Sequence, residues 1–150
     1  MFCSNEYDII HYIGDAEFNV KQPDNSKLHF ADSGLSANEI QRLSFSQRPI
    51  IFANGCSTSR TLTNLYIGKT SSLATAFLKA GALAFIGTMW PIEDKMAAEF
   101  ASDFYMNVIE YSIGESLKKT RLNMKLKKNE HDAWLPYSFF GDPLRRIRKN

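Results

Sequence analysis

Three short apolar runs, each followed by small or polar residues, place the strongest constraint on the fold of this chain. Their sequences are DIIHYIG at 8–14, PIIFAN at 49–54 and ALAFIGT at 82–88. None of them alternates cleanly between apolar and polar residues, which is typical of strands covered on both faces in a parallel sheet. Helical patterns lie between and after these runs. The order strand, helix, strand therefore predicts an α/β domain with a mostly parallel sheet, right-handed connections and helices on both faces.

The helices are expected from capping residues and from apolar residues spaced three or four apart. A capping box of Ser36 and Glu39 opens the first helix, which ends at residue 43. The second begins at Ser71 or Ser72 and stops at Gly81, and the others are expected over 94–108 and 114–128. Two further elements complete the pattern: a hairpin over 17–31 around PDNS, and a last strand in YSFFGDP.

Composition limits the class of protein. The 150 residues are 44% hydrophobic, enough for one core and too little for two, and the net charge of +2 creates no field that requires nucleic acid or an acidic membrane. Two cysteines, Cys3 and Cys56, form no disulfide framework, and no apolar run reaches the length of a membrane span. Cysteines and histidines show no metal-ligand spacing. We therefore expect a soluble cytoplasmic protein with neither metal nor other cofactor.

The carboxyl ends of the three apolar runs bring chemically active residues to one rim. In parallel sheets the ligand site lies beyond these ends. Here they are followed by Asp15, by Cys56 and by Asp94. A structural cysteine would lie inside an apolar run, whereas Cys56 is expected in a turn that Gly55 allows to bend sharply. This position is typical of a nucleophile, whose thiolate forms when a neighbouring histidine takes the proton.

Longer stretches, in order along nearly the whole chain, share a specific family pattern. They are DIIHYIGDAEFN, FADSGLSANEIQRL, RPIIFANGCSTS, GALAFIGTMWPIEDKMAAEFASDFYMNVIE, GESLKKTRLNMK and WLPYSFFGDP. Together they resemble CHAT domains, the caspase-like peptidases often joined to tetratricopeptide repeats. The resemblance implies a caspase-like fold with a cysteine–histidine dyad, as in separase and gingipain. It covers residues 1–144 as a partial CHAT domain, and residues 145–150 form a basic tail.

The resemblance also implies roles for single residues. The nucleophile corresponds to Cys56. The family pattern around the histidine strand, His-Phe-x-Gly-His-Gly, is HYIGDA here, so His11 is kept and Asp15 occupies the position of the catalytic histidine. A carboxylate, with a reference pKa of about 3.9, is a poor acceptor for a thiol proton and a poor donor at neutral pH. His11 lies on the same strand about 13 Å before Asp15, at ~3.3 Å per residue, and is expected to be structural.

The substrate-binding residues implied by the resemblance are Asp94, Gly55 and Trp90. In separase and gingipain-like peptidases, an acid in the loop after this strand receives a basic side chain of the substrate, and WPIED resembles that loop. The alternative is that Asp94 caps the helix starting at residue 95, and both roles are compatible. His29 and His131 have no counterpart in the family and are interpreted as surface histidines.

Caspase-like domains have two further strands before the histidine strand, and none is visible in this sequence. Without them, the strand at 8–13 would be a bare apolar edge that is prone to aggregation. We therefore expect self-association, or a partner chain that supplies the missing strands.

Three functions remain open at this point. The first is a pseudo-enzyme that has lost its base and acts as a peptide-binding or assembly module around Cys56 and Asp94. The second is an active cysteine endopeptidase with a preference for basic residues, in which another group supplies the base. The third, nucleic-acid binding through the lysine-rich helix over 118–128, has less support because such lysines are typical of a solvated helix face.

Overall fold

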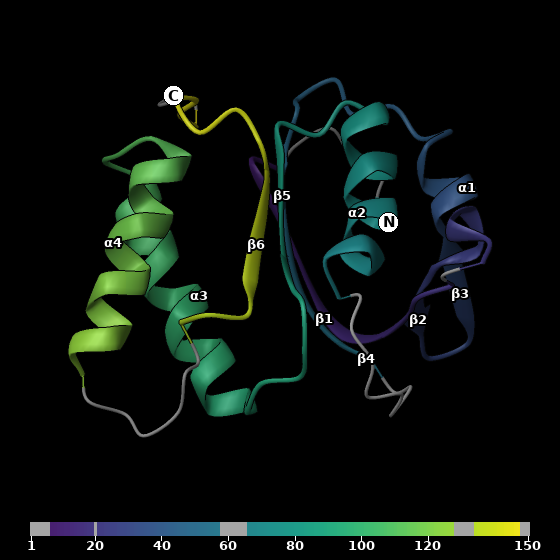
Figure 1. The fold of residues 1–150 in the computed structure, drawn as a ribbon. Coiled ribbons are helices and arrows are strands. Elements are labelled where there is room, and N and C mark those ends of the chain that lie inside the picture. Colours follow the sequence, from purple (N-terminus) through teal and green to yellow (C-terminus); the bar gives the residue numbers. More distant parts are fainter. Residues whose placement is uncertain (1–6, 20, 58–65, 128–133, 148–150) are drawn as a thin grey trace. The chain divides into compact units, whose positions relative to one another are not determined.

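The computed structural model describes residues 7–19, 21–57, 66–127 and 134–147 (Figure 1). Within them a six-stranded sheet has the order β3-β2-β1-β4-β5-β6. Neighbours β1 and β4 are parallel, as are β4 and β5, whereas β1–β2 and β2–β3 are antiparallel. The strands are β1 (Ile9–Glu17), β2 (Lys27–Phe30), β3 (Ser33–Ser36), β4 (Ile50–Ser57), β5 (Ala84–Thr88) and β6 (Tyr137–Gly141). This mixed sheet with helices confirms the predicted α/β, caspase-like fold class.

The helices largely follow the local signals in the sequence. They are η1 (Pro23–Asn25), α1 (Ala37–Ile40), α2 (Tyr66–Lys79), α3 (Asp94–Val108) and α4 (Ile113–Leu126). The capping box is confirmed, because the Ser36 hydroxyl accepts from the Glu39 amide at 3.2 Å and the Glu39 carboxylate accepts from the Ser36 amide at 2.8 Å. None of the described helices is both long and apolar enough to cross a membrane.

The predicted start of α2 is wrong. The helix begins at Tyr66, before Ser71 and Ser72. Ser72 does not cap it: its hydroxyl donates to the hydroxyl of Ser26, 3.0 Å away in the hairpin. Ser72 was mistaken for a helix cap because a serine that makes a tertiary contact cannot be told from a capping serine in the sequence. The predicted stop is confirmed, because Gly81 has a φ of +101°, which favours glycine, and the helix ends at Lys79.

The strands that hold the candidate site are longer than predicted. β1 continues past Gly14 to Glu17, and β4 continues past Asn54 to Ser57. Asp15 and Cys56 therefore lie within strands, not in turns beyond them. The reason is pairing, because the parallel ladder extends to the last pair, Ala16 with Ser57, and supplies backbone partners that the local sequence does not reveal.

β2 pairs with the carboxyl end of β1 and not with the segment 8–13, for which a bare edge was expected, so that expectation stays a prediction. The chain turns back after β1, and β2 joins its outer side with Ala16 opposite Leu28 and Glu17 opposite Lys27. β1 is therefore an inner strand of the sheet order. The hairpin over 17–31 is confirmed by this pairing. The next hairpin, β2 to β3, was not predicted, because the SGLS of β3 has only one apolar residue.

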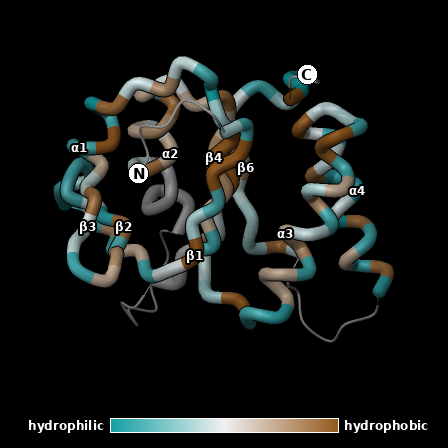
Figure 2. Tube along the Cα trace, turned by 180° about the vertical axis from the view of Figure 1, so that it is seen from behind, coloured by the Kyte–Doolittle hydropathy of each residue, from teal (hydrophilic) through white to brown (hydrophobic). Residues whose placement is uncertain are grey.

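The first compact unit comprises residues up to Pro91 together with Ser138–Gly141. Its core places Phe77 of α2 between two other aromatic rings, with centroid distances of 6.3 Å to Phe45 and 5.7 Å to Phe85. Residues 50–53 of β4 are all buried, and Figure 2 shows this hydrophobic run in brown. Burial of consecutive residues confirms that this strand is covered on both faces.

The second compact unit comprises Ile92–Tyr137 and the residues from Asp142 onward. The inward residues predicted for α3 are confirmed as buried: Ala97, Phe100, Ala101, Phe104 and Val108. Phe100 stacks on Tyr137 with a centroid distance of 3.7 Å, and the Arg121 guanidinium donates to the Tyr137 carbonyl. Arg145 forms an ion pair with Asp142, and its carbonyl accepts from the amide of Ile113 at the start of α4.

Candidate functional site

Asp15 and Cys56 lie opposite each other on adjacent parallel strands. The register pairs Asp15 with Cys56, and the preceding residues, Gly14 and Gly55, with each other. Adjacent strands are about 4.8 Å apart, so the backbone of Asp15 is next to that of Cys56. This is the relation that the resemblance implies between the base and the nucleophile. Of the predicted site residues, the structure brings Asp15, Gly55 and Cys56 together.

Asp15 lies on the solvent-exposed face of β1. Burial alternates along this strand, with Tyr12 and Ala16 buried while Ile13, Asp15 and Glu17 are exposed. Ile13 is 74% exposed, which is unusual for a large apolar residue in a strand. The carboxylate of Asp15 is therefore accessible to water and to a ligand, and an exposed apolar side chain lies two residues before it on the same face.

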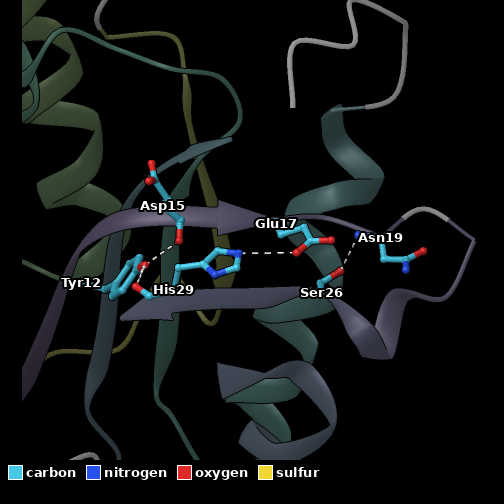
Figure 3. A network of polar contacts seen from close by, with 6 residues as sticks. All are labelled: Tyr12, Asp15, Glu17, Asn19, Ser26 and His29. Carbon is cyan, nitrogen blue, oxygen red and sulfur yellow. Dashed lines mark hydrogen bonds and ion pairs between the residues drawn. The ribbon is translucent and has the colours of Figure 1, made fainter. Parts of the chain in front are cut away.

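Tyr12 and Gly14 hold the end of β1 against β2 (Figure 3). The Tyr12 hydroxyl lies 2.6 Å from the carbonyl oxygen of Asp15 and 2.7 Å from that of His29, so its proton is donated at the junction of the two strands. A Cβ atom added to Gly14 would lie only 2.7 Å from this hydroxyl. The sequence context suggested that Gly14 ends the strand, but β1 continues to Glu17. Because Gly14 has no side chain, the Tyr12 ring can lie against the backbone at this position.

Replacing Gly14 by alanine is expected to lower the free energy of unfolding by about 1–3 kcal/mol, as overpacking typically does. Tyr12 is only 5% exposed, so its ring has little room to retreat without losing both carbonyl contacts. The matched control is Gly34→Ala in β3, where the nearest atom to an added Cβ is 3.5 Å away. Urea unfolding of both variants checks the prediction, and equal changes at the two glycines would contradict it.

A histidine–carboxylate pair next to Asp15 was missed by the sequence analysis. The Nε2 of His29 lies 3.5 Å from Oε2 of Glu17, and both side chains are partly exposed. Continuing the β1–β2 register by one residue from Ala16 and Leu28 places His29 beside Asp15. Figure 3 shows the Asp15 carboxylate pointing away from the His29 ring. His29 is at the surface, as expected. Its place beside the site follows from the register of the β1–β2 hairpin, which was the signal needed to predict it.

His11 is confirmed as a structural residue. Its Nε2 lies 3.1 Å from the side-chain nitrogen of Asn54, and its ring packs edge-on against Phe52 at 5.1 Å. Burial lowers the pKa of His11. Both the burial and an amide donor facing Nε2 favour the neutral ring over the charged one. His11 pairs in register with Phe52, four residues before Cys56, so it is not positioned to accept the thiol proton.

The other predicted site residues are placed as follows. Asp94 is the first residue of α3, whereas the N-cap is Glu93, so the interpretation of Asp94 as the cap is wrong. Its exposed carboxylate in the first turn favours the helix through the helix dipole. Asp94 belongs to the second unit, whereas Trp90, 36% exposed, belongs to the first. His131 lies outside the described residues, and no metal-ligand cluster of three or more side chains occurs among those described.

A comparison with protein families adds to this geometry. The family model described as "CHAT domain" matches residues 2–142. No curated protein matches the chain. The match covers nearly the whole sequence and is consistent with the α/β fold. The chain therefore belongs to the CHAT domain family and has the caspase-like, peptidase-related fold of that family.

Proposed function

We propose that this CHAT domain is catalytically impaired and acts as a peptide-binding or assembly module. The observation that supports this best is the register of β1 with β4, which puts Asp15, and not a histidine, opposite Cys56. The proposal concerns the surface formed by the carboxyl ends of these two strands.

A carboxylate at this position opposes both proton transfers of a cysteine peptidase. The first moves a proton from the thiol to a base, and a negative charge nearby disfavours the thiolate. The second returns the proton to the leaving amine, for which an exposed aspartate is the wrong acid at neutral pH. Asp15 is exposed and no histidine replaces it on its own strand, because His11 is held by Asn54.

The exposed face of β1 favours a peptide with a basic and an apolar side chain. Asp15 and Glu17 offer carboxylates for charge-assisted hydrogen bonds, and Ile13 offers an apolar contact. Asp94 is carried over from the family resemblance as a further acid for a Lys or Arg side chain. The cytoplasmic location expected from the cysteine content would keep Cys56 reduced.

Binding without cleavage is the expected result with fluorescent peptides. Peptides containing Lys or Arg should bind more tightly than matched norleucine peptides, as measured by anisotropy, and mass spectrometry should detect no cleavage. Asp15→Asn should weaken the binding of basic peptides up to about fivefold, the range of an exposed ion pair. Asp32→Asn, in the turn between β2 and β3, is a charge-matched control that should leave affinity unchanged.

The second candidate is an active cysteine endopeptidase that uses a base on β2. His29, held by Glu17 at 3.5 Å and next to Asp15 in register, favours it. In this case His29 would take the proton from Cys56 and return it to the leaving amine. Peptide cleavage by the natural chain that disappears in both Cys56→Ala and His29→Asn would establish this candidate and contradict the first.

A further inference from the structure

A polar hollow opens on the exposed face of the hairpins formed by β1, β2 and β3. Its volume is about 540 Å³, within the size range of small-molecule sites. The register pairs Glu17 with Lys27 and Lys27 with Ser36, so these three side chains form one row across the strands. Gly34 lies two residues before Ser36 on the same face, and Glu39 of α1 also lines the hollow. We call this hollow the hairpin pocket.

Folding does not require a glycine at position 34. The φ angle of Gly34 is not positive, unlike those of Gly81 and Gly141. A Cβ atom added to Gly34 would lie 3.5 Å from Cδ of Lys27, which is an ordinary contact. A glycine inside a strand costs stability, because it loses more backbone freedom on folding than other residues do. Gly34 instead provides space, since a larger side chain would project into the hairpin pocket beside Lys27 and His29.

Three charged side chains of the hairpin pocket keep a group for a ligand. Among the residues that the structure describes, no carboxylate forms an ion pair with Lys27. The capping box uses Oε2 of Glu39 and leaves its Oε1. The pair with His29 uses Oε2 of Glu17 and leaves its Oε1 (Figure 3). The pocket therefore offers two carboxylate oxygens and one ammonium group, an excess of one negative charge.

The same charged groups are close enough to act on one small ligand. Glu17 and Lys27 are directly opposite, and the Cβ atoms of such pairs are about 4.5–5.5 Å apart. Hydrogen bonds from Ser36 lower the pKa of Glu39, and the nearby charge of Lys27 lowers it further. A ligand whose carboxylate binds Lys27 can therefore reach Glu17 and Glu39 with cationic groups a few bonds away.

Two asparagines that line the hairpin pocket are held by Gln22. Oδ1 of Asn19 accepts from the Gln22 amide at 2.9 Å, and Nδ2 of Asn25 donates to Oε1 of Gln22 at 2.6 Å. These contacts leave Nδ2 of Asn19 as a donor and Oδ1 of Asn25 as an acceptor. The described lining residues include no aromatic or large apolar side chain, so the pocket is unsuited to an apolar ligand or a stacked base.

We propose that the hairpin pocket binds a free basic α-amino acid, with arginine as the best fit. The carboxylate of the ligand pairs with Lys27, and its α-ammonium and guanidinium groups pair with Glu17 and Glu39. Such a ligand carries two positive charges and one negative charge, the inverse of the pocket. A polyanion would be repelled by the two carboxylates, and a polyamine would leave Lys27 without a partner. The proposal is independent of the peptide-binding function, because Asp15 does not line the pocket.

Titration of the full chain with arginine, followed by NMR of the backbone amides, tests the proposal. The Kd should be on the order of 1 mM, as for a small ligand held by a few exposed ion pairs. Saturable shifts are expected at Glu17, Lys27, Gly34 and Ser36. Citrulline lacks the side-chain charge and agmatine lacks the carboxylate, so each should bind about fivefold more weakly. Nα-acetylarginine amide, which represents an arginine inside a peptide, should also bind more weakly because it lacks both α-charges.

Two variants alter the hairpin pocket independently. Lys27→Met should weaken arginine binding about fivefold but should not weaken agmatine binding, because agmatine has no carboxylate. Gly34→Val fills the hollow and should abolish arginine binding. Asp32→Asn, in the neighbouring turn, is a control that should leave the affinity unchanged.

Three results would each overturn the proposal. The first is the absence of saturable shifts at about 10 mM arginine, roughly tenfold above the expected Kd. The second is agmatine binding as tight as that of arginine. The third is a Gly34→Val variant that binds arginine like the natural chain.

Discussion

Replacing Asp15 by histidine should raise the rate at which a Lys- or Arg-type acyloxymethyl ketone labels Cys56 by at least ~10²-fold, the lower end of what a positioned general base contributes. The register places residue 15 opposite Cys56, so the new imidazole would occupy the position at which the catalytic histidine of the family accepts the thiol proton. It would also remove a negative charge that disfavours the thiolate. The labelling rate is measured by intact-mass spectrometry over time, with peptide mapping to identify the modified residue.

Two further variants identify the cause of any labelling. Asp15→Asn removes the charge without adding a base, so it should raise the rate far less than Asp15→His. Labelling of the natural chain as fast as that of Asp15→His would contradict the impaired-enzyme proposal. If that fast labelling then disappeared in His29→Asn, the base would be the imidazole held by Glu17.

Phe77→Ala should lower the free energy of unfolding of the first unit by about 3–5 kcal/mol, the usual cost of truncating a fully buried phenylalanine. Phe77 is fully buried and stacks between Phe45 and Phe85, so no neighbouring ring fills the cavity without moving another. Because domains are stable by only about 5–15 kcal/mol, such a loss is a large part of the total. Urea unfolding followed by circular dichroism measures it.

The matched control lies on the same helix. Thr75 is exposed, so Thr75→Ala should change stability by no more than about 0.5 kcal/mol. A loss of less than about 1 kcal/mol for Phe77→Ala, with the control unchanged, would mean that the aromatic stack is not a rigid part of the core.

Local interactions explain the parts of the fold that the sequence predicted well. The capping box of Ser36 and Glu39 needs only residues within one turn, and the buried side of α3 follows from apolar residues spaced three or four apart. The apolar run at 50–53 predicted a strand covered on both faces for the same kind of reason. These features depend on neighbours in the chain, so sequence alone determined them, together with the family resemblance.

Contacts between distant segments decided the rest. Where β1 and β4 end depends on the ladder between them, so the sequence placed Asp15 and Cys56 in turns, whereas they are paired within strands. Gly14 was interpreted as a strand end from its local sequence. The structure gives another reason for a glycine there, because the Tyr12 hydroxyl, which contacts the carbonyl of His29 on another strand, occupies the space of a side chain. The same strand pairing put His29 next to the site. The sequence determined which residues are present for chemistry, and only the tertiary structure decided which of them lie side by side, because backbone pairing between segments far apart in the chain sets the register.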